Sequence, residues 1–448
     1  MLEKIIEILK ESKADAWEIT DTKTRGWEFY FIRHDLDQNR AKDVEHIRLT
    51  VHRSLDNGEA LGSASDEINP TDSIEDIKRK VDQLIYTAGF VKNKAYSLVK
   101  PSQEVVSNQK TVDIAKVAED FITTMRSIHE TETEDINSYE IFVNEVERRY
   151  VNSEGVDLCE TYPNSMVEAV VNARKDGHEI ELYRMYNSGG CDKEGLTRDV
   201  TKTLQYGKDR LSAVPTPKLP KMAVIFSTSD STSIYQYFIQ KLSAASVYRK
   251  LSDWKIGEAI AQDVKGDTVT LKTVKELPNS SENFNYDDEG APIREVTLLD
   301  ANVPMQYWGG CMFASYMNLK DSFKISNIVV SGGQKDETTL RTGKYLEVVE
   351  FSDFQVDPVT VNVFGEIRLG YLHDGDKVTV VSGGSLSGSM NDYVKISGFE
   401  KIEGVEILYL QKTEKYDFFK IVNAQKPLLA TKGGVVEDGC FIITPEGD

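Results

Sequence analysis

The sequence has six histidines, and two of them are followed by glutamate. These pairs are His129-Glu130 and His178-Glu179. A zinc-protease helix needs a second histidine about one turn further on, so that two imidazoles bind the metal while the glutamate activates water. Neither segment provides that histidine, and we interpret both pairs as solvent-exposed. Neither pair therefore forms a zinc-protease site, and the residues alone indicate no self-evident catalytic centre.

Two other segments contain residue types that could bind a ligand. Asp287, Asp288 and Glu289 precede Gly290, but alternate carboxylates diverge and the spacing of a calcium loop is absent. An acidic turn is the favoured interpretation, and a metal hydrolase site built from these three acids is the alternative. The glycine-rich segment 382–388, SGGSLSG, lacks the lysine of a phosphate-binding loop, so we predict a connection between strands.

The four cysteines, at positions 159, 191, 311 and 440, lie far apart and form no Cys-x-x-Cys pair. This spacing argues against a zinc ribbon, a redox motif and a disulfide framework. The N-terminus has acids at positions 3 and 7 and does not look like a signal peptide. No stretch approaches the roughly 18 apolar residues that span a bilayer. We expect a cytoplasmic protein that does not contact membranes.

The elements that would position these residues follow from hydrophobic periodicity. The chain has 448 residues, which suggests two to three domains at about 150 residues each. Helices are expected near residues 2–9, 72–89, 114–128 and 193–211, the second with a capping box formed by Asp72 and Glu75. Strands are expected at 17–32, 46–53, 60–65, 139–151, 156–161, 166–174 and 178–186. Tight turns join most of them, including Asn57-Gly58, so the sheet should be mainly antiparallel with helices on one face.

Prolines at 215, 217 and 220 mark the best candidate for a linker. We therefore predict an N-terminal α+β domain at 1–214, a linker at 215–221 and a C-terminal domain at 222–448. The second domain begins with a strand at 222–226 and a helix at 231–247. From residue 268 onward, strand patterns punctuated by glycine predominate. The fold class is α+β, with a β-rich second domain that contains one or two helices.

The net charge of the chain is −20, and no segment is rich in Lys or Arg. Nucleic-acid binding normally requires a basic face that displaces counterions from phosphates. The composition therefore disfavours direct contact with DNA or RNA.

Six segments, in order along the chain, resemble the TldD/PmbA family, historically described as modulators of DNA gyrase. The most specific is NYDDEGAPIREVTLLDANVPMQYWGGCMFASYM at 285–317, similar to the family's D-D-E-G-x-P stretch. A strand followed by a central helix, AVIFSTSDSTSIYQYFIQKLSAASV, lies at 223–247. The other similar segments are at 150–171, 256–264, 326–340 and 357–378.

The resemblance also implies a branch of the family. TldD-like members carry His-Glu-x-x-x-His on the central helix and complete a zinc site with a C-terminal cysteine. Here residues 231–247 contain no His, Glu, Asp or Cys, and the surroundings of Cys440 do not resemble that cysteine segment. This pattern is similar to the PmbA/TldE-like branch. It implies that this chain has no catalytic residue, no metal ligand and no cofactor, and that zinc is expected only in a TldD-like partner.

The implied function is that of a non-catalytic subunit of a metalloprotease that cleaves unfolded or small modified peptides. Its implied partners are a TldD-like subunit, in a dimer, and the peptide substrate. An extended peptide would be bound largely through main-chain hydrogen bonds. From the position of segments in the family pattern, we expect Asp288, Glu289, Gly290, Gly383 and Gly384 to contact it. The alternative is a homodimeric module that binds peptides or proteins on its own, including a gyrase-regulating role.

Overall fold

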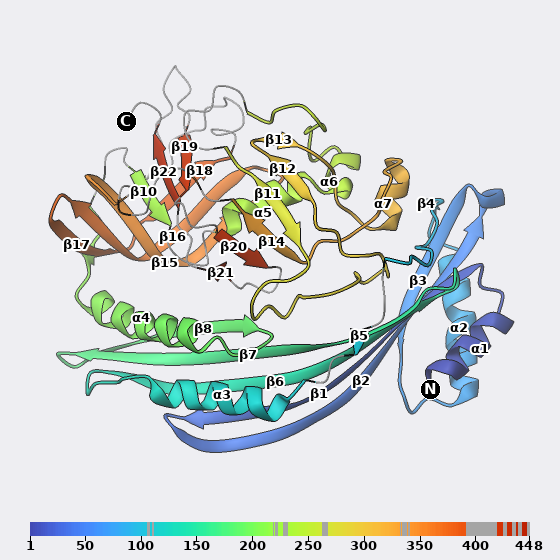
Figure 1. Ribbon diagram of the computed structural model, residues 1–448, viewed down its shortest axis with the longest axis horizontal. Coiled ribbons are helices and arrows are strands. Elements are labelled where there is room, and N and C mark those ends of the chain that lie inside the picture. Colours follow the sequence, from blue (N-terminus) through green and yellow to red (C-terminus); the bar gives the residue numbers. More distant parts are fainter. Residues whose placement is uncertain are drawn as a thin grey trace.

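The computed structural model shows a long, curved sheet that carries a β-rich second half along its length (Figure 1). It describes residues 1–390 apart from 105–107, 110–111, 218, 220–222, 227–231, 262–267, 332, 334–337 and 339–340. Beyond Met390 it describes four strand segments, 419–423, 428–431, 436–437 and 441–445. The predicted α+β class is confirmed, with an antiparallel sheet and helices in the first half and a β-rich second half. Among the described residues, no helix is both long and apolar enough to cross a membrane.

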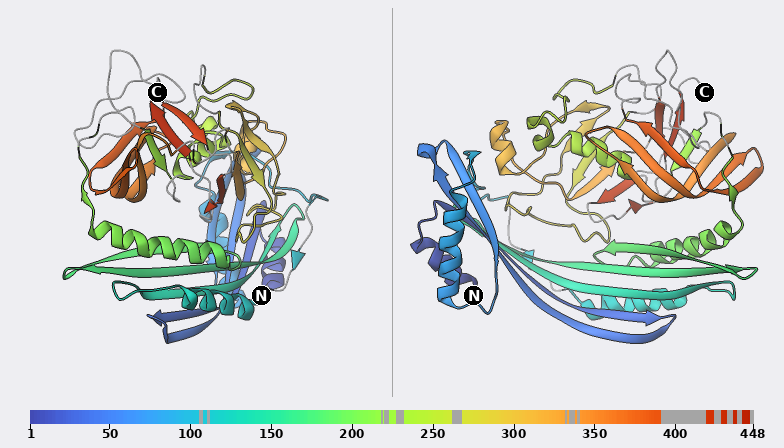
Figure 2. Two further views of the ribbon diagram at one scale, coloured as in Figure 1. Left: turned by 60° about the vertical axis from the view of Figure 1, so that its left-hand side comes forward. Right: turned by 180° about the vertical axis from the view of Figure 1, so that it is seen from behind.

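The first sheet has eight strands in the order β4-β3-β2-β1-β6-β7-β5, with β8 also paired to β7. All pairs are antiparallel except the short β5–β7 pair. Its longest strands have 17 to 21 residues, and Figure 2 shows them curving beneath the second half. The strands are β1 (Ala16–Ile32), β2 (Asp35–Leu55), β3 (Ala60–Ile68), β4 (Asn93–Lys94), β5 (Asn108–Gln109), β6 (Glu134–Asn152), β7 (Asp157–Lys175) and β8 (His178–Ser188).

Four amphipathic helices bury one face of this sheet in two clusters. The helices are α1 (Leu2–Glu11), α2 (Ile74–Ala88), α3 (Ile114–Ser127) and α4 (Lys193–Leu211). The first two pack with Ile19 and Leu49 in one cluster, and the last two pack with Phe31 and Ile141 in the other. Because side chains alternate along a strand, the intervening positions of β1 and β6 point to the opposite face. That face carries Arg148 and Tyr150, which contact the second half of the chain, and Glu18, which accepts from the Tyr150 hydroxyl.

The second half contains two further sheets. One has the order β19-β22-β10-β15-β16-β17-β9 with β18 on β16, and it consists of β9 (Val214–Pro215), β10 (Ala223–Phe226), β15 (Lys344–Val356), β16 (Asn362–Asp374), β17 (Lys377–Ser382), β18 (Ser385–Ser389), β19 (Phe419–Asn423) and β22 (Phe441–Pro445). The other has the order β13-β12-β11-β14-β20-β21, and it consists of β11 (Leu271–Val274), β12 (Thr297–Asp300), β13 (Val303–Pro304), β14 (Asn327–Val330), β20 (Leu428–Thr431) and β21 (Val436–Glu437).

Helix α5 (Thr232–Lys241) is the centre of the core between these two sheets. Its apolar side chains, such as Ile234 and Phe238, pack in one cluster with Phe226 and Leu346 of one sheet and Leu271 of the other. Two short helices, α6 (Ala244–Tyr248) and α7 (Cys311–Tyr316), follow later in the chain. The prediction of one continuous helix at 231–247 is therefore wrong, because α5 and α6 are separated by a break at residues 242–243.

Trp308 explains this break in the helix. The Trp308 amide donates to the Leu242 carbonyl (3.2 Å), and the Ala244 amide donates to the Trp308 carbonyl (2.8 Å). The Trp308 indole Nε1 donates to the Ile239 carbonyl (2.8 Å). The Leu242 carbonyl and the Ala244 amide therefore pair with Trp308 instead of with an adjacent turn of the helix.

Three other details differ from the sequence predictions. The strands predicted at 156–161 and 166–174 are one strand, β7, which runs through Pro163. That proline pairs with β6 on one side, at a point where β7 has no described partner on the other, so its missing N–H disrupts no ladder. The strand predicted at 46–53 is longer and begins at Asp35. Its exposed polar first half is held by pairing with β1 rather than by burial of one face. The cap of α2 is Ser73, which accepts from the Asp76 amide, rather than Asp72.

A buried ion pair joins the first sheet to the second half of the chain. Arg148 on β6 donates from Nη2 to Glu160 Oε1 on β7 (2.5 Å), and these residues are 9% and 2% exposed. The same nitrogen donates to the Tyr286 carbonyl (2.6 Å), while the Tyr286 hydroxyl donates to the Arg148 carbonyl (2.7 Å). Glu160 Oε2 accepts from the Asn285 amide (3.0 Å). Each strand of the pair therefore binds the loop that precedes β12.

Replacing Arg148 by Met should destabilise the protein strongly, because it leaves the Glu160 carboxylate buried without its partner. Breaking such a pair costs about 3–5 kcal/mol. The neighbouring Arg149 makes a more exposed pair with Asp157, so Arg149→Met should cost less than about 1 kcal/mol. Urea unfolding of both variants and of Arg148→Met/Glu160→Gln measures the difference, and the double variant should recover part of the loss. Equal midpoints for the two single variants would contradict this account.

Candidate functional site

The acidic segment predicted to contact substrate is a turn whose first residue, Asp287, is buried. Asp287 Oδ1 accepts from the amides of Glu289 (2.9 Å) and Ala291 (2.9 Å), and Oδ2 accepts from the Lys324 amide (2.8 Å). Burial and the charge of Glu289 raise the pKa of Asp287 to about 6, against these three amides, which lower it. Asp287 thus holds the turn together from inside.

The next two acids point to Lys324. Lys324 Nζ lies 2.8 Å from Asp288 Oδ1 and 2.9 Å from Glu289 Oε1. Burial alone would lower the pKa of Lys324, but Glu289 and Asp288 outweigh it and raise that pKa. Glu289 Oε2 also accepts from the amide of Cys311 (2.7 Å), and burial together with Glu289 raises the pKa of the Cys311 thiol. The thiol therefore stays protonated at neutral pH and is a poor nucleophile.

Gly290 lies directly against the first sheet. Its φ is +80°, and a Cβ atom there would lie 2.8 Å from the ring of Tyr150. The Tyr150 hydroxyl donates to Glu18 Oε2 (2.6 Å), and Glu18 Oε1 lies 2.8 Å from Nε2 of the buried His52. The absence of a side chain at position 290 allows the acidic turn to approach the sheet.

A pocket of about 380 Å³ opens beside this turn. One wall is the loop after β4, and the other comprises the residues after the acidic turn, helix α7 and the segment that follows it. The residues that line it are Ser97, Leu98, Val99, Lys100, Ser102, Ala291, Pro292, Arg294, Cys311, Ala314, Ser315, Leu319, Lys320, Asp321 and Ser322. It is within the range of small-ligand sites.

Gly383 and Gly384 have a different environment. They connect β17 to β18 with φ values of +87° and +81°, so the segment is a strand connection, as predicted. The Gly383 amide donates to the Ile367 carbonyl (2.8 Å), and its carbonyl accepts from the Thr216 hydroxyl (2.7 Å). These glycines lie in the sheet that contains β17 and β18, whereas the acidic turn lies against the first sheet. The structure therefore does not bring the two segments together. Their contact with substrate stays a prediction.

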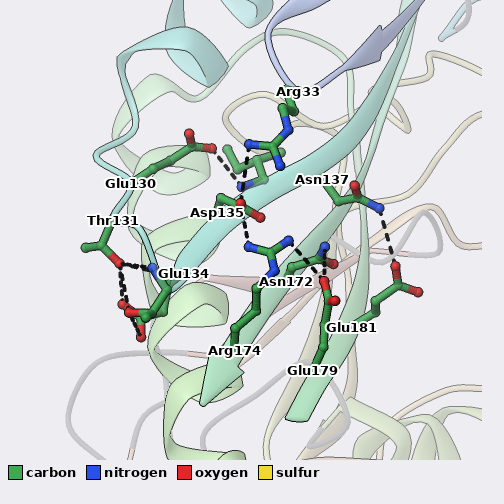
Figure 3. A network of polar contacts seen from close by, with 12 residues as sticks. Arg33, Glu130, Thr131, Glu134, Asp135, Asn137, Asn172, Arg174, Glu179 and Glu181 are labelled. Atoms are coloured by element: carbon green, nitrogen blue, oxygen red, sulfur yellow. Dashed lines mark hydrogen bonds and ion pairs between the residues drawn. The ribbon is translucent and has the colours of Figure 1, made fainter. Parts of the chain in front are cut away.

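The two His-Glu pairs lie at one end of the first sheet, where their glutamates have structural roles. His129 and His178 are exposed, as predicted. Glu130 accepts from the Ile136 amide (2.7 Å), and Glu179 pairs with Arg174 (3.0 Å). Figure 3 shows Glu179 beside Arg174, which also pairs with the buried Asp135.

Helix α5 does not fit a zinc ion. Zinc sites use cysteine, histidine or carboxylate ligands. The sequence of α5 is TSIYQYFIQK, and its one ionisable nitrogen, Lys241 Nζ, donates to the Leu251 carbonyl (2.7 Å). Within the described parts of the chain, no group of three His, Cys, Asp or Glu side chains could hold a metal ion. Cys440 lies outside the described residues.

Sequence reasoning did not find the partners of the acidic turn. These partners lie 30 to 140 positions away from the turn in the sequence, and no local pattern connects them to it. They are Arg148, Tyr150 and Lys324. Cys311 was within the segment that resembles the family, but its place on the pocket wall was not predicted.

Replacing Gly290 by Ala should destabilise the protein for two reasons, a positive φ and a clash with Tyr150. Gly257 has the same φ of +80° with nothing within 4 Å of an added Cβ, so Gly257→Ala is the matched control. The control should lose about 1–2 kcal/mol, and Gly290→Ala a further 1–3 kcal/mol or so. Chemical unfolding curves give both values. Equal losses would show that the turn does not press on Tyr150.

The pKa of Asp287 makes stability depend on pH. A folded-state pKa of about 6, above the ordinary 3.8, means that the folded protein binds the extra proton between these values. The contribution of this group is complete below about pH 4 and lost by about pH 6, falling by about 1.4 kcal/mol per pH unit. Unfolding free energies measured from pH 4 to 7 should show this slope in the wild type and not in Asp287→Asn. An unchanged slope in the variant would contradict the assignment.

Comparison with known proteins agrees with the family resemblance. Residues 220–401 match the family model described as the PmbA/TldA metallopeptidase C-terminal domain. No curated protein sequence matches the chain.

Solved structures extend the similarity to the whole fold. TldE from Thermococcus kodakarensis superposes with a TM-score of 0.71 at 15% identity, covering 99% of this chain and 98% of its own. A DNA gyrase modulator, by its description, from Thermotoga maritima gives 0.69 at 13%, covering 99% of both chains. One from Bacteroides thetaiotaomicron gives 0.66 at 16%, covering 98% of this chain and 97% of its own. The predicted resemblance to the TldD/PmbA family is confirmed by the match of residues 220–401 to the family's metallopeptidase C-terminal domain.

Proposed function

We propose that this chain is a PmbA/TldE-like, non-catalytic subunit of a TldD/TldE-type metalloprotease that cleaves unfolded or small modified peptides. A TldD-like partner subunit supplies the zinc ion and the glutamate that activates water. This chain contributes walls that position the substrate. The family model names a metallopeptidase domain, and one of the similar structures is TldE, which supports the proposal.

The observation that carries the proposal is the state of helix α5. At this place in the family pattern, a catalytic member would present two imidazoles and a carboxylate. Here Ile234, Tyr235, Tyr237, Phe238 and Ile239 are at most 2% exposed and pack in the core between two sheets. The helix also ends at Lys241, because residues at 242–244 pair with Trp308. Its burial and its early end both indicate that α5 is part of the hydrophobic core.

We also propose a cytoplasmic location and no direct contact with DNA. The described cysteines, Cys159, Cys191 and Cys311, form no disulfide, which suits a reducing compartment. The net charge of −20 opposes binding to phosphates. A gyrase-related role, if the chain has one, would then act through protein contact or proteolysis.

The test compares this chain alone, a TldD-like subunit with His-Glu-x-x-x-His alone, and the two mixed. We expect zinc and cleavage of an unfolded peptide in the mixture, and neither substantial zinc nor cleavage in this chain alone. Metal analysis, a quenched-fluorescence peptide assay and the mass of the complex measure these properties. The control is a mixture in which the partner's motif glutamate is replaced by Gln, which should form a complex but not cleave.

Two outcomes would reject the proposal. Stoichiometric zinc with cleavage by this chain alone would make it the catalytic subunit. Peptide binding by a homodimer that ignores every TldD-like subunit would favour the alternative, a binding module that acts on its own.

A further inference from the structure

The pocket beside the acidic turn has a chemical character that differs from the rest of the chain. In a protein with net charge −20, three cationic side chains, Lys100, Arg294 and Lys320, line this one pocket, against a single lining acid, Asp321. Four serine hydroxyls also line it, from Ser97, Ser102, Ser315 and Ser322. The pocket therefore offers many hydrogen-bond donors to a bound group and favours a negative charge.

Arg294 is held in place but is not saturated. Its terminal nitrogens pair with Glu104 and, at 3.5 Å, with Asp321. Its buried Nε–H has no acceptor among the described residues. A guanidinium whose terminal nitrogens are already held can donate to one further oxygen ligand with little loss of side-chain entropy.

The two lysines at the pocket are available. Lys100 and Lys320 are exposed, and neither forms an ion pair with a described residue. The loop after β4 carries Lys100, while Lys320 follows α7 on the other wall. An anion in the pocket would attract both walls.

The remaining lining is apolar and buried. Leu98, Ala291, Pro292, Cys311 and Ala314 are all buried residues on its walls. The Cys311 thiol, whose amide binds Glu289, contributes a small uncharged surface. This half of the pocket suits an aliphatic side chain and disfavours a small hydrated anion such as inorganic phosphate.

We propose that this pocket binds the free C-terminal carboxylate of a short peptide, with the last aliphatic side chain on the apolar wall. Arg294, Lys100 and Lys320 provide the positive charge that binds the carboxylate, and the serine hydroxyls complete its hydrogen bonds. The proposal rests on the proposed function, since it names the end of the peptide substrate that this subunit holds. It assigns recognition of a chain terminus to a subunit that has no metal ligands on its central helix.

The experiment measures binding of two labelled peptides to the purified full-length chain by fluorescence anisotropy. Both end in Ala-Leu, one with a free carboxylate and one with a carboxamide. We expect the acid to bind at least about tenfold more tightly, because charge-assisted hydrogen bonds to a carboxylate each contribute about 1.5–3 kcal/mol. Raising the salt concentration should weaken binding of the peptide acid and leave the affinity for the peptide amide nearly unchanged.

Variants on the pocket surface locate the site. Lys320→Glu should lower the affinity for the peptide acid by about tenfold or more. Ser315→Trp should abolish binding, because the indole would fill the pocket from an exposed position on α7. Lys202→Glu makes the same charge change on the exposed face of α4 and should bind as the wild type. Thermal unfolding verifies that each variant is folded. Since Lys320 is exposed, its variant remains informative even if Ser315→Trp does not fold.

Equal affinity for acid and amide, or wild-type affinity in Lys320→Glu, would overturn the proposal. Competition by inorganic phosphate without any preference for the acid peptide would show a general anion site and reject the peptide assignment. These results are independent of the test of subunit role. If the chain alone is catalytic but binds the peptide acid selectively, only the proposed function is rejected. If the mixed pair cleaves with zinc but this chain shows no preference for the acid, only the inference is rejected.

Discussion

The buried contact between Arg148 and Glu160 is the constraint on which the arrangement of the two halves depends. Two charges out of water need further hydrogen bonds besides their own pairing, and here the loop before β12 provides an acceptor to Arg148 and a donor to Glu160. Phe284 and Tyr286 also place their rings 4.9 and 4.7 Å from the guanidinium. The acidic turn, Lys324, the Cys311 segment and the pocket follow directly from this anchor, because each is fixed by a contact to the previous one.

The state of α5 bears on the role proposed for this chain. In this chain, α5 packs against both sheets of the second half and is interrupted by Trp308. The pocket beside the acidic turn instead offers hydrogen-bond donors and an apolar wall.

Much of the fold could be predicted from the sequence, and the reasons for the failures are physical. Helices α1, α3 and α4 were predicted because their apolar stripes have a helical period and each packs on one side. The break after Lys241 could not be predicted, since the interruption comes from Trp308, far along the chain. The same holds for the site. Asp287 to Gly290 were recognised as an acidic turn with glycine, but which side chains they meet depends on pairing between β6 and β7, and local patterns contain no information about it.

The central position of β1 has a consequence for synthesis of the protein. Strand β1 lies between β2 and β6, and its residue Glu18 pairs with Asn152. At a ribosomal rate of about 5–20 residues per second, the nascent β1–β2 hairpin waits roughly ten seconds before its second partner is made. During that interval one edge of β1 exposes unpaired amides and carbonyls, the surface through which strands of different chains associate. Order of translation, rather than final stability, thus sets the period in which this chain is most vulnerable to aggregation.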